Sequence, residues 1–371
     1  MLLFLTAINF LHYGQLILPI ICLIVFIDHK LRFEVNDPVV FILLCLFAVS
    51  FYAFSRKDFY CVMGFTLPMA YYIGSNIRHP SKENVKKIIY LFAIAMGCHL
   101  LLDLLRDLIL RGPEKVMHAS THYDIWTNEK ISSTLISVEL DLLIGCFYYL
   151  LMHEKDKKIK LISIFLFIVG MGYCLIMGRR APILMFFLAV FFGFLFDKTV
   201  SEKQRKIFFV SMGSLIAIFI VFAAIYSFDL FGLKAVLDHF YIFEKVSRGL
   251  MDSRLGIYRE AFKLLGKYPW GGQQISSSIG IQIHELWLDV YDYAGVITYL
   301  LLLGYTFFFV KGYYKGFTRS KGSSFTSLCA SLFVCFTIQM FLEPVMTAAS
   351  LFLLITIMIG TMIERIDDER K

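Results

Sequence analysis

The chain alternates between long apolar runs and short polar connections. A membrane-spanning helix needs about 20 mostly apolar residues, and runs of about this length cover roughly 2–27, 37–54, 59–77, 87–110, 132–152, 160–177, 181–197, 207–232, 289–310, 323–342 and 345–363. The first run is long and contains Gly14 and Pro19, so two shorter pieces are an alternative to one helix. The pattern predicts an all-α, polytopic integral membrane protein with about 11 or 12 transmembrane helices.

Composition supports a membrane protein. Of the 371 residues 58% are hydrophobic and only 18% are charged, whereas a soluble domain carries about a quarter charged residues. The net charge of +7 is attributed to basic loops, so no nucleic-acid partner is expected. The 8 Cys residues are scattered and form no CxxC motif, which predicts neither a disulfide framework nor a metal site. The N-terminus lacks a basic n-region and a cleavage site, which favours a retained helix over a signal peptide.

The short basic loops predict the orientation. Lys and Arg gather in four short connections that fall on alternate turns of the chain, near residues 78–87, 155–160, 198–206 and 311–321. The positive-inside rule makes these loops cytoplasmic. The external parts are then the loop at about 111–131, the arginine turn 177–182, and a large loop at 233–288. The large loop separates an N-terminal group of spans, 1–232, from a C-terminal group with a cytoplasmic tail, 289–371.

Two external segments nevertheless carry arginine. Arg179 and Arg180 occupy a very short turn, and the large loop contains Arg248, Arg254 and Arg259. Long loops escape the positive-inside rule, but that rule does not explain why their charge is positive. Arginine binds phosphate oxygens through two parallel hydrogen bonds. An anionic ligand on the outer face is therefore the simplest interpretation.

An amphipathic helix is predicted from Ser253 onward within the large loop. Its apolar face is expected to carry Leu255, Tyr258, Ala261, Phe262 and Leu265. Gly266 and Pro269 predict where the helix ends, and such a helix lies on the membrane surface or against the bundle. Arg254 falls in its first turn, where backbone N–H groups favour an anion. The alternative for basic residues here, above all Lys263 and Lys267, is contact with lipid head groups.

A histidine follows this loop at the mouth of the next span. His284 titrates near neutrality and suits general-base work on a hydroxyl, if a partner orients its ring. The neighbouring acids Glu285, Asp289 and Asp292 are not obviously placed to do so. The alternative is an ordinary interfacial histidine.

Several ionisable residues interrupt the spans themselves, where each is costly unless it is paired or wetted. They are His99, Asp103, Arg106 and Asp107 in one span and Glu139 and Asp141 in the next. We expect Arg106 to pair with Asp103 or with an acid of the next span. The loop 111–131, with His118, His122 and Trp126, is a candidate for recognising an acceptor, and Glu343 is a candidate partner for a basic residue.

These residues, taken in order, resemble the O-antigen ligase and O-antigen polymerase superfamily of bacterial envelope polysaccharide assembly. Arg180 with Leu184 four residues later matches the start of one motif, and Arg254 with Pro269-Trp-Gly271 matches the large-loop motif. His284, Gly295 and Thr298 fit the spacing of the third motif. Glu285 stands where the ligases carry a small amide or hydroxyl residue, which favours the polymerases.

The resemblance implies a GT-C-like fold and glycosyl transfer without a cofactor or metal, at the outer face of the bacterial cytoplasmic (inner) membrane. The implied donor and acceptor are undecaprenyl-diphosphate-linked saccharides, and a chain-length regulator protein is a further candidate partner. Arg180 and Arg254 would bind the diphosphate, and His284 would accept the proton of the attacking hydroxyl. The implied substrate-binding residues are Arg179, Arg248, Arg259, Glu285 and Tyr258. Two alternatives remain open: a ligase that transfers finished glycan, and a non-enzymatic transporter or flippase of lipid-linked saccharide.

Overall fold

A computed structural model describes residues 1–55, 63–77, 80–116, 119, 121–229 and 252–366. In chain order the elements are α1 (Leu2–Ala7), η1 (Phe10–His12), η2 (Gly14–Ile17), α2 (Leu18–Asp28), α3 (Pro38–Phe54), η3 (Met63–Phe65), α5 (Thr66–Asn76), α6 (Lys82–Arg111), α7 (Pro113–Val116), β1 (Thr121–Tyr123), β2 (Lys130–Ser132), α8 (Thr134–His153), α9 (Lys157–Ile176), α10 (Ala181–Phe196), α11 (Glu202–Ser227), α14 (Asp252–Leu264), α15 (Gln274–Ile279), α16 (Leu286–Arg319), α17 (Phe325–Leu342), α18 (Val345–Ala348) and α19 (Ser350–Glu364).

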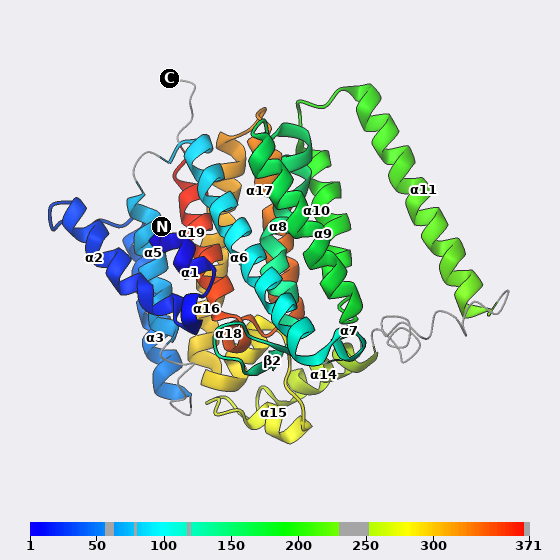
Figure 1. The fold of residues 1–371 in the computed structure, drawn as a ribbon. Helices are drawn as coiled ribbons and strands as arrows, with labels where there is room; N and C mark the ends of the chain where they lie inside the picture. Colours follow the sequence, from blue (N-terminus) through cyan, green and yellow to red (C-terminus); the bar gives the residue numbers. More distant parts are fainter. Residues whose placement is uncertain (56–62, 78–79, 117–118, 120, 230–251, 367–371) are drawn as a thin grey trace.

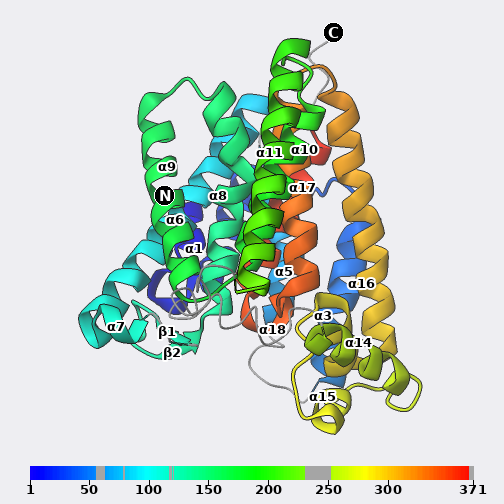
Figure 2. The same cartoon turned by 90° about the vertical axis from the view of Figure 1, so that its right-hand side faces the viewer.

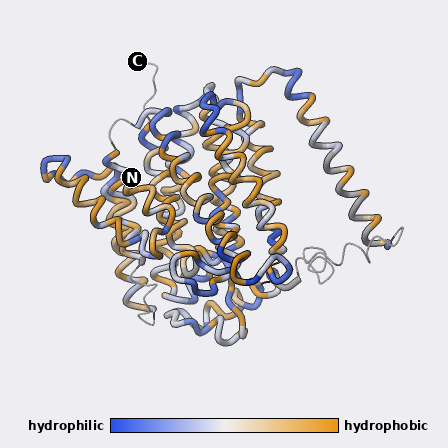
Figure 3. The backbone as a smooth tube through the Cα atoms, viewed as in Figure 1, coloured by the Kyte–Doolittle hydropathy of each residue, from blue (hydrophilic) through white to orange (hydrophobic). Residues whose placement is uncertain are grey.

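The apolar helices lie side by side in a bundle, with α11 standing apart from it (Figure 1). Within the bundle α10 packs against α17 and α8, α16 against α3, and α19 against α5. Figure 3 shows apolar backbone through the middle of the bundle and polar segments at both ends. Large apolar side chains also face outward, as Leu161, Phe165 and Ile168 do along α9. Such outward faces would be unfavourable in water but suit contact with lipid.

Five helices in the described part of the chain are long and apolar enough to cross a membrane, and four apolar segments are shorter. The five are α6, α8, α9, α16 and α17, and the shorter ones are η2 with α2, α3, α10 and α19. The fold is therefore that of a mostly helical protein with several candidate membrane spans. The predicted number of 11 or 12 spans stays a prediction.

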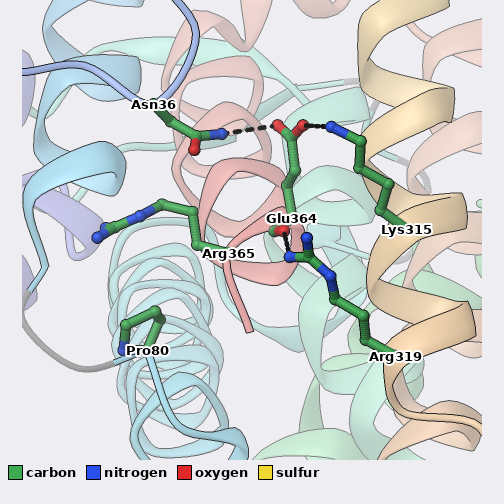
Figure 4. Close-up of a pocket in the computed structure, with 6 residues that line it drawn as sticks. All are labelled: Asn36, Pro80, Lys315, Arg319, Glu364 and Arg365. Carbon is green, nitrogen blue, oxygen red and sulfur yellow. Dashed lines mark hydrogen bonds and ion pairs between the residues drawn. The ribbon is translucent and has the colours of Figure 1, made fainter. Parts of the chain in front are cut away.

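The two ends of the bundle differ. The connections α5–α6, α8–α9, α10–α11 and α16–α17 lie together at one end, here called the basic end (Figure 1). There Glu364 draws several groups together: its carboxylate accepts hydrogen bonds from Lys315 (2.7 Å) and Asn36 (3.0 Å), and its backbone carbonyl accepts one from Arg319 (2.6 Å) (Figure 4). The arginine turn 177–182, α14, α15 and α18 lie at the opposite end, here called the site end.

The first apolar run is broken, as one of the two alternatives from the sequence expected. Asn9, Leu11 and His12 have positive φ angles, which interrupt helical hydrogen bonding between α1 and α2. Gly14 packs so closely on α1 that a Cβ there would lie 2.5 Å from the Thr6 carbonyl oxygen.

The predicted external loop 111–131 contains a small β-hairpin, which is a local addition to a mostly helical fold. β1 pairs with β2 in antiparallel register, Thr121 opposite Ser132 and Tyr123 opposite Lys130. The hairpin lies at the same end of the bundle as α14 and α15, on the other side of that end (Figure 2). Asp107 of α6 accepts a hydrogen bond from the backbone N–H of Tyr123 (3.0 Å), which fixes the hairpin to the bundle.

The predicted amphipathic helix forms as α14, but its buried face differs from the prediction. Ala261 is fully buried and Tyr258 is half-buried, as expected, whereas Phe262 is 59% exposed. Ile257 and Leu264 pack on the small core that α14 shares with α15 and the start of α16. The face is rotated because α14 packs against these elements, and Phe262 then lies outside the contact.

Candidate functional site

Three segments that are distant in sequence meet at the site end. Arg180 is the N-cap residue of α10, Arg254 lies in the first turn of α14, and His284 immediately precedes the N-cap residue of α16. Burial and the nearby Arg254 cation lower the pKa of Arg180. Burial, with the charges of Arg254 and Arg179, also lowers the pKa of His284. The structure thus brings together the three residues that the sequence singled out as catalytic candidates.

The C-terminal end of α17 holds Arg254 and Tyr258 in place. The Arg254 guanidinium donates a hydrogen bond to the carbonyl of Leu342, and the Tyr258 hydroxyl donates one to the carbonyl of Phe341 (3.0 Å). The last carbonyls of a helix lack helical partners and carry the negative end of its dipole, so they attract a cation. Tyr258 also contacts the backbone carbonyl of His284 at 3.4 Å. Tyr258 therefore links α14 to both α17 and the catalytic candidate.

The arginine turn connects Arg254, Tyr258 and His284 with the part of the site end that carries the hairpin. Arg179 donates a hydrogen bond to the hydroxyl of Ser133, which immediately precedes α8. Arg179 and Arg180 are both half-buried. In the following we call Arg179, Arg180, Arg254 and His284 the arginine cluster.

Glu343 is the acid that faces this cluster. It is buried where α17 ends, and burial raises its pKa to about 7 although the charges of Arg254 and Arg179 act in the opposite direction. Near neutral pH Glu343 is therefore only partly ionised and neutralises the arginines incompletely. Glu343 lies within electrostatic range of Arg254 and Arg179, and its role as the partner of a basic residue stays a prediction.

His284 is suited to accept a proton. Its φ angle is 60°, a left-handed conformation that is uncommon outside glycine and is often found at functional sites. No described group makes a hydrogen bond to its buried Nδ1 atom. Since its pKa is lowered, the ring is neutral at pH 7 and has a lone pair available for a hydroxyl proton.

Two glycines position His284 through a kink in α16. Gly295 has φ 76° and ψ −175°, which interrupts the helix at its tenth residue. The backbone N–H of Val296 donates to the carbonyl of Pro269 (2.8 Å), and that of Gly272 donates to Tyr293 (2.9 Å). A Cβ on Gly295 would lie 2.5 Å from the Pro269 oxygen, and one on Gly271 would lie 2.6 Å from the Gly295 nitrogen. Both positions require glycine because the two backbones touch.

Two further residues of the resemblance have structural contacts. Glu285 caps α16, its carboxylate accepting a hydrogen bond from the N–H of Leu288 (2.6 Å), and burial raises its pKa to about 7. Thr298 is buried and donates to the hydroxyl of Ser50 on α3 (3.1 Å). The structure therefore gives Glu285 a capping contact that the sequence did not predict.

Of the two remaining arginine candidates, the structure describes only Arg259, and it is not brought to the cluster. Arg259 is exposed on α14 and points away from the buried face. Arg248 lies outside the described residues, as do residues 233–251 of the predicted large loop. Lys263 is exposed and pairs with Glu260 on the same helix (2.6 Å), in keeping with a solvated or head-group role.

The predicted pairing of Arg106 with Asp103 or with an acid of α8 is wrong. Arg106 donates two hydrogen bonds to the side-chain oxygen of Asn128, at 3.0 and 2.9 Å. Asp103 is fully buried and turns toward the hairpin, where it accepts a hydrogen bond from the N–H of Ile125 (2.8 Å). The sequence did not show this contact because it depends on how the hairpin folds back over α6.

No protein-family model matches the chain, and no curated protein matches it. The candidate site is therefore defined by its own geometry: a group of arginines around a neutral histidine, held by the ends of α10, α14, α16 and α17. Such a group can bind a doubly charged phosphate ester and place a base beside it.

Proposed function

We propose that the protein is a polysaccharide polymerase, a glycosyltransferase that joins repeat units carried on undecaprenyl diphosphate. The reaction takes place at the outer face of the bacterial cytoplasmic membrane and inverts the anomeric carbon. The observation that carries the proposal is the meeting of Arg180, Arg254 and His284 at the end of the bundle opposite the basic loops.

The chemistry assigns each residue a role. The acceptor's sugar hydroxyl attacks the anomeric carbon of the donor glycan, and His284 accepts the hydroxyl proton. The bond between the anomeric carbon and the phosphate oxygen breaks, and the lipid diphosphate leaves with the bonding electron pair. Arg180 and Arg254 stabilise the negative charge that develops on this leaving group, which is where fixed positive charge accelerates a reaction most.

The membrane setting agrees with these roles. A lipid diphosphate has its charged group at the membrane surface and its chain among the helices, so its binding site needs cations at one end of an apolar bundle. The arginine cluster lies at the site end of a bundle whose middle is apolar. Tyr258 and the exposed Trp270 lie nearby on the same loop and are available for contact with a sugar ring.

The test uses the source strain with its chromosomal gene deleted and plasmid copies supplying variants. Arg180→Ala, Arg254→Ala and His284→Ala are each expected to lower the transfer rate on the order of 10²–10³-fold. The measurement is the ladder of glycan lengths on a gel, with protein levels in the membrane checked by immunoblot. Lys263→Ala, which removes an exposed cation from the same helix as Arg254, is the matched control and should give the wild-type ladder.

The products also distinguish other activities. Single repeat units on the final acceptor support polymerisation. Accumulation of full-length polymer on the lipid carrier instead indicates a ligase, and accumulation of single lipid-linked units on the cytoplasmic face indicates a flippase. Wild-type ladders from all three variants would overturn the assignment of the site.

A further inference from the structure

A second polar cluster lies at the site end, between α6, α8 and the hairpin. His99 and Asp103 come from α6, Glu139 from α8, and His122 and Asp124 from the hairpin segment. The side chains of His99, Asp103 and Asp124 are all at least nine-tenths buried, with exposures of 3%, 0% and 0%. We call these five residues the acidic cluster.

The histidine nitrogens and aspartate oxygens of this cluster lie farther apart than in a normal hydrogen bond. They are still close enough to bind the same ion. His99 Nε2 lies 3.6 Å from Asp124 Oδ2 and 3.8 Å from Asp103 Oδ1, and His122 Nε2 lies 3.4 Å from Asp103 Oδ2. Two ligands of one tetrahedral Zn²⁺, each about 2.0–2.1 Å from the ion, lie about 3.4 Å apart. One donor atom each from His99, Asp103 and Glu139 lies within 4.8 Å of the other two.

Several of these buried atoms have no hydrogen-bond partner in the described part of the chain. They are His99 Nε2, Asp103 Oδ2, His122 Nε2, Asp124 Oδ2 and Glu139 Oε2. Buried polar atoms are nearly always paired, and leaving one unpaired costs about 1–3 kcal/mol. Asp124 Oδ2 and Asp103 Oδ1 lie 3.6 and 3.8 Å from the unpaired His99 Nε2, so these atoms indicate a ligand that they share.

A His–Asp pair at the basic end shows how this chain builds an ordinary buried pair. His153 Nε2 lies 2.5 Å from Asp197 Oδ2, which also accepts from the Tyr148 hydroxyl at 3.0 Å. The other oxygen of Asp197 accepts two hydrogen bonds from Thr199. Both oxygens of Asp197 therefore accept hydrogen bonds. In the acidic cluster, each distance from a histidine nitrogen to an aspartate oxygen is about 1 Å longer than the distance from His153 to Asp197.

Charge and ring orientation favour a cation. Three carboxylates, Asp103, Asp124 and Glu139, contact His99, and Asp124 Oδ2 also lies 3.5 Å from Nδ1 of His12. His99 Nδ1 lies 2.5 Å from Glu139 Oε1, so the tautomer that donates to Glu139 presents the Nε2 lone pair to the cluster. A carboxylate that orients a metal-binding histidine in this way is a common second layer of metal sites.

We propose that His99, Asp103 and Asp124 bind one divalent transition-metal cation, that Glu139 orients the His99 ring, and that the ion fastens the hairpin to α6 and α8. Imidazole combined with carboxylate oxygen suits Zn²⁺ or Mn²⁺ better than Ca²⁺ or Mg²⁺, which prefer oxygen ligands alone. The site is separate from the arginine cluster, and it takes no part in the proposed glycosyl transfer. The proposed metal site can therefore be confirmed or overturned independently of the proposed function.

The test measures metal content and thermal stability of the full-length protein, purified in detergent through a tag without histidines. Wild type is expected to hold about one ion per chain by elemental analysis. Its unfolding midpoint should fall after chelation and recover with added Zn²⁺ or Mn²⁺. Asp103→Asn and His99→Gln should each lower metal content at least tenfold and abolish the response to added metal, and Glu139→Gln should weaken binding by about 10–100-fold.

Asp107→Asn is the matched control. Asp107 lies one turn after Asp103 and also bonds the hairpin, but its oxygens are occupied by Tyr123 N–H and by the Tyr173 hydroxyl (2.6 Å). This variant should loosen the hairpin without losing metal. If Asp103→Asn does not fold, Asp124→Asn replaces it. The proposal is overturned if wild type contains no metal and its unfolding midpoint does not shift with Zn²⁺ or Mn²⁺. It is also overturned if only Ca²⁺ or Mg²⁺ stabilises the protein, or if the substituted proteins bind metal as well as wild type.

Discussion

The site end carries two polar clusters of opposite character. The arginine cluster gathers cations from α10 and α14 around His284, while the acidic cluster gathers carboxylates from α6, α8 and the hairpin around His99. In the first, a histidine sits near positive charge and its pKa is lowered. In the second, a histidine sits among carboxylates. The same residue type therefore has opposite surroundings on the two sides of one surface.

The ligands proposed for the two clusters differ in the same way, an anion at the arginine cluster and a cation at the acidic cluster. Bringing like charges together in a partly buried place is unfavourable unless a counter-charge joins them. A bound anion would supply this counter-charge at the arginine cluster, and a bound cation would supply it at the acidic cluster.

A substitution that distorts the arginine cluster should leave the acidic cluster unchanged. Gly295→Ala is expected to have the largest such effect on activity. An added Cβ would collide with the Pro269 backbone and would occupy a positive φ angle, so the kink that sets the position of His284 must shift. Because a displacement of about 1 Å costs about 10²-fold in rate, chain elongation should fall about 10²-fold. The measurement is the glycan ladder, run together with metal content, which should remain at the wild-type level.

Gly256→Ala is the control for this substitution. Gly256 lies in α14 with open space around the added methyl group, and alanine favours a helix by up to about 1 kcal/mol. This variant should be as active as wild type. An active Gly295→Ala protein would show that the contact between Pro269 and the kink does not position the site.

The electrostatics of the arginine cluster can be tested through pH, with a smaller effect. His284 must be neutral to act as a base, and its lowered pKa puts the acidic limb of the rate profile below its ordinary value near 6.5. Arg179→Gln removes one cation that lowers this pKa, so the limb should move to higher pH while the rate falls about tenfold. The rate is measured with lipid-linked units in detergent between pH 5 and 8. A limb that stays in place while the rate falls would mean that His284 is not the titrating base.

Much of the fold could be predicted because it depends on local patterns. Apolar runs locate the bundle helices, and Pro269 explains why the segment after α14 does not continue as helix. The meeting of Arg180, Arg254 and His284 followed from the resemblance and from topology. The acidic cluster could not be found in this way, because it depends on a short hairpin whose register places Asp124 beside His99. The exposed position of Phe262 likewise depends on packing by α15, which periodicity alone does not reveal.

The smallest expected effect concerns the acid that faces the arginine cluster. The pKa of Glu343 is raised from 4.5 to about 7, so the folded protein holds its proton where the unfolded chain has already lost it. Stability contributed by this group is then present at low pH and lost as pH rises from about 4.5 to 7. The rise is about 2.5 pKa units, and each unit corresponds to about 1.4 kcal/mol, which sets an upper limit of about 3.5 kcal/mol. Glu343→Gln should match wild type near pH 4.5 and have the higher unfolding midpoint at pH 8. Glu260→Gln, on the exposed face of α14, should show no such divergence. If Glu343→Gln is instead less stable than wild type at pH 8, the ionised carboxylate is a true ion-pair partner of Arg254, and the arginine cluster carries less unbalanced charge than an anion site requires.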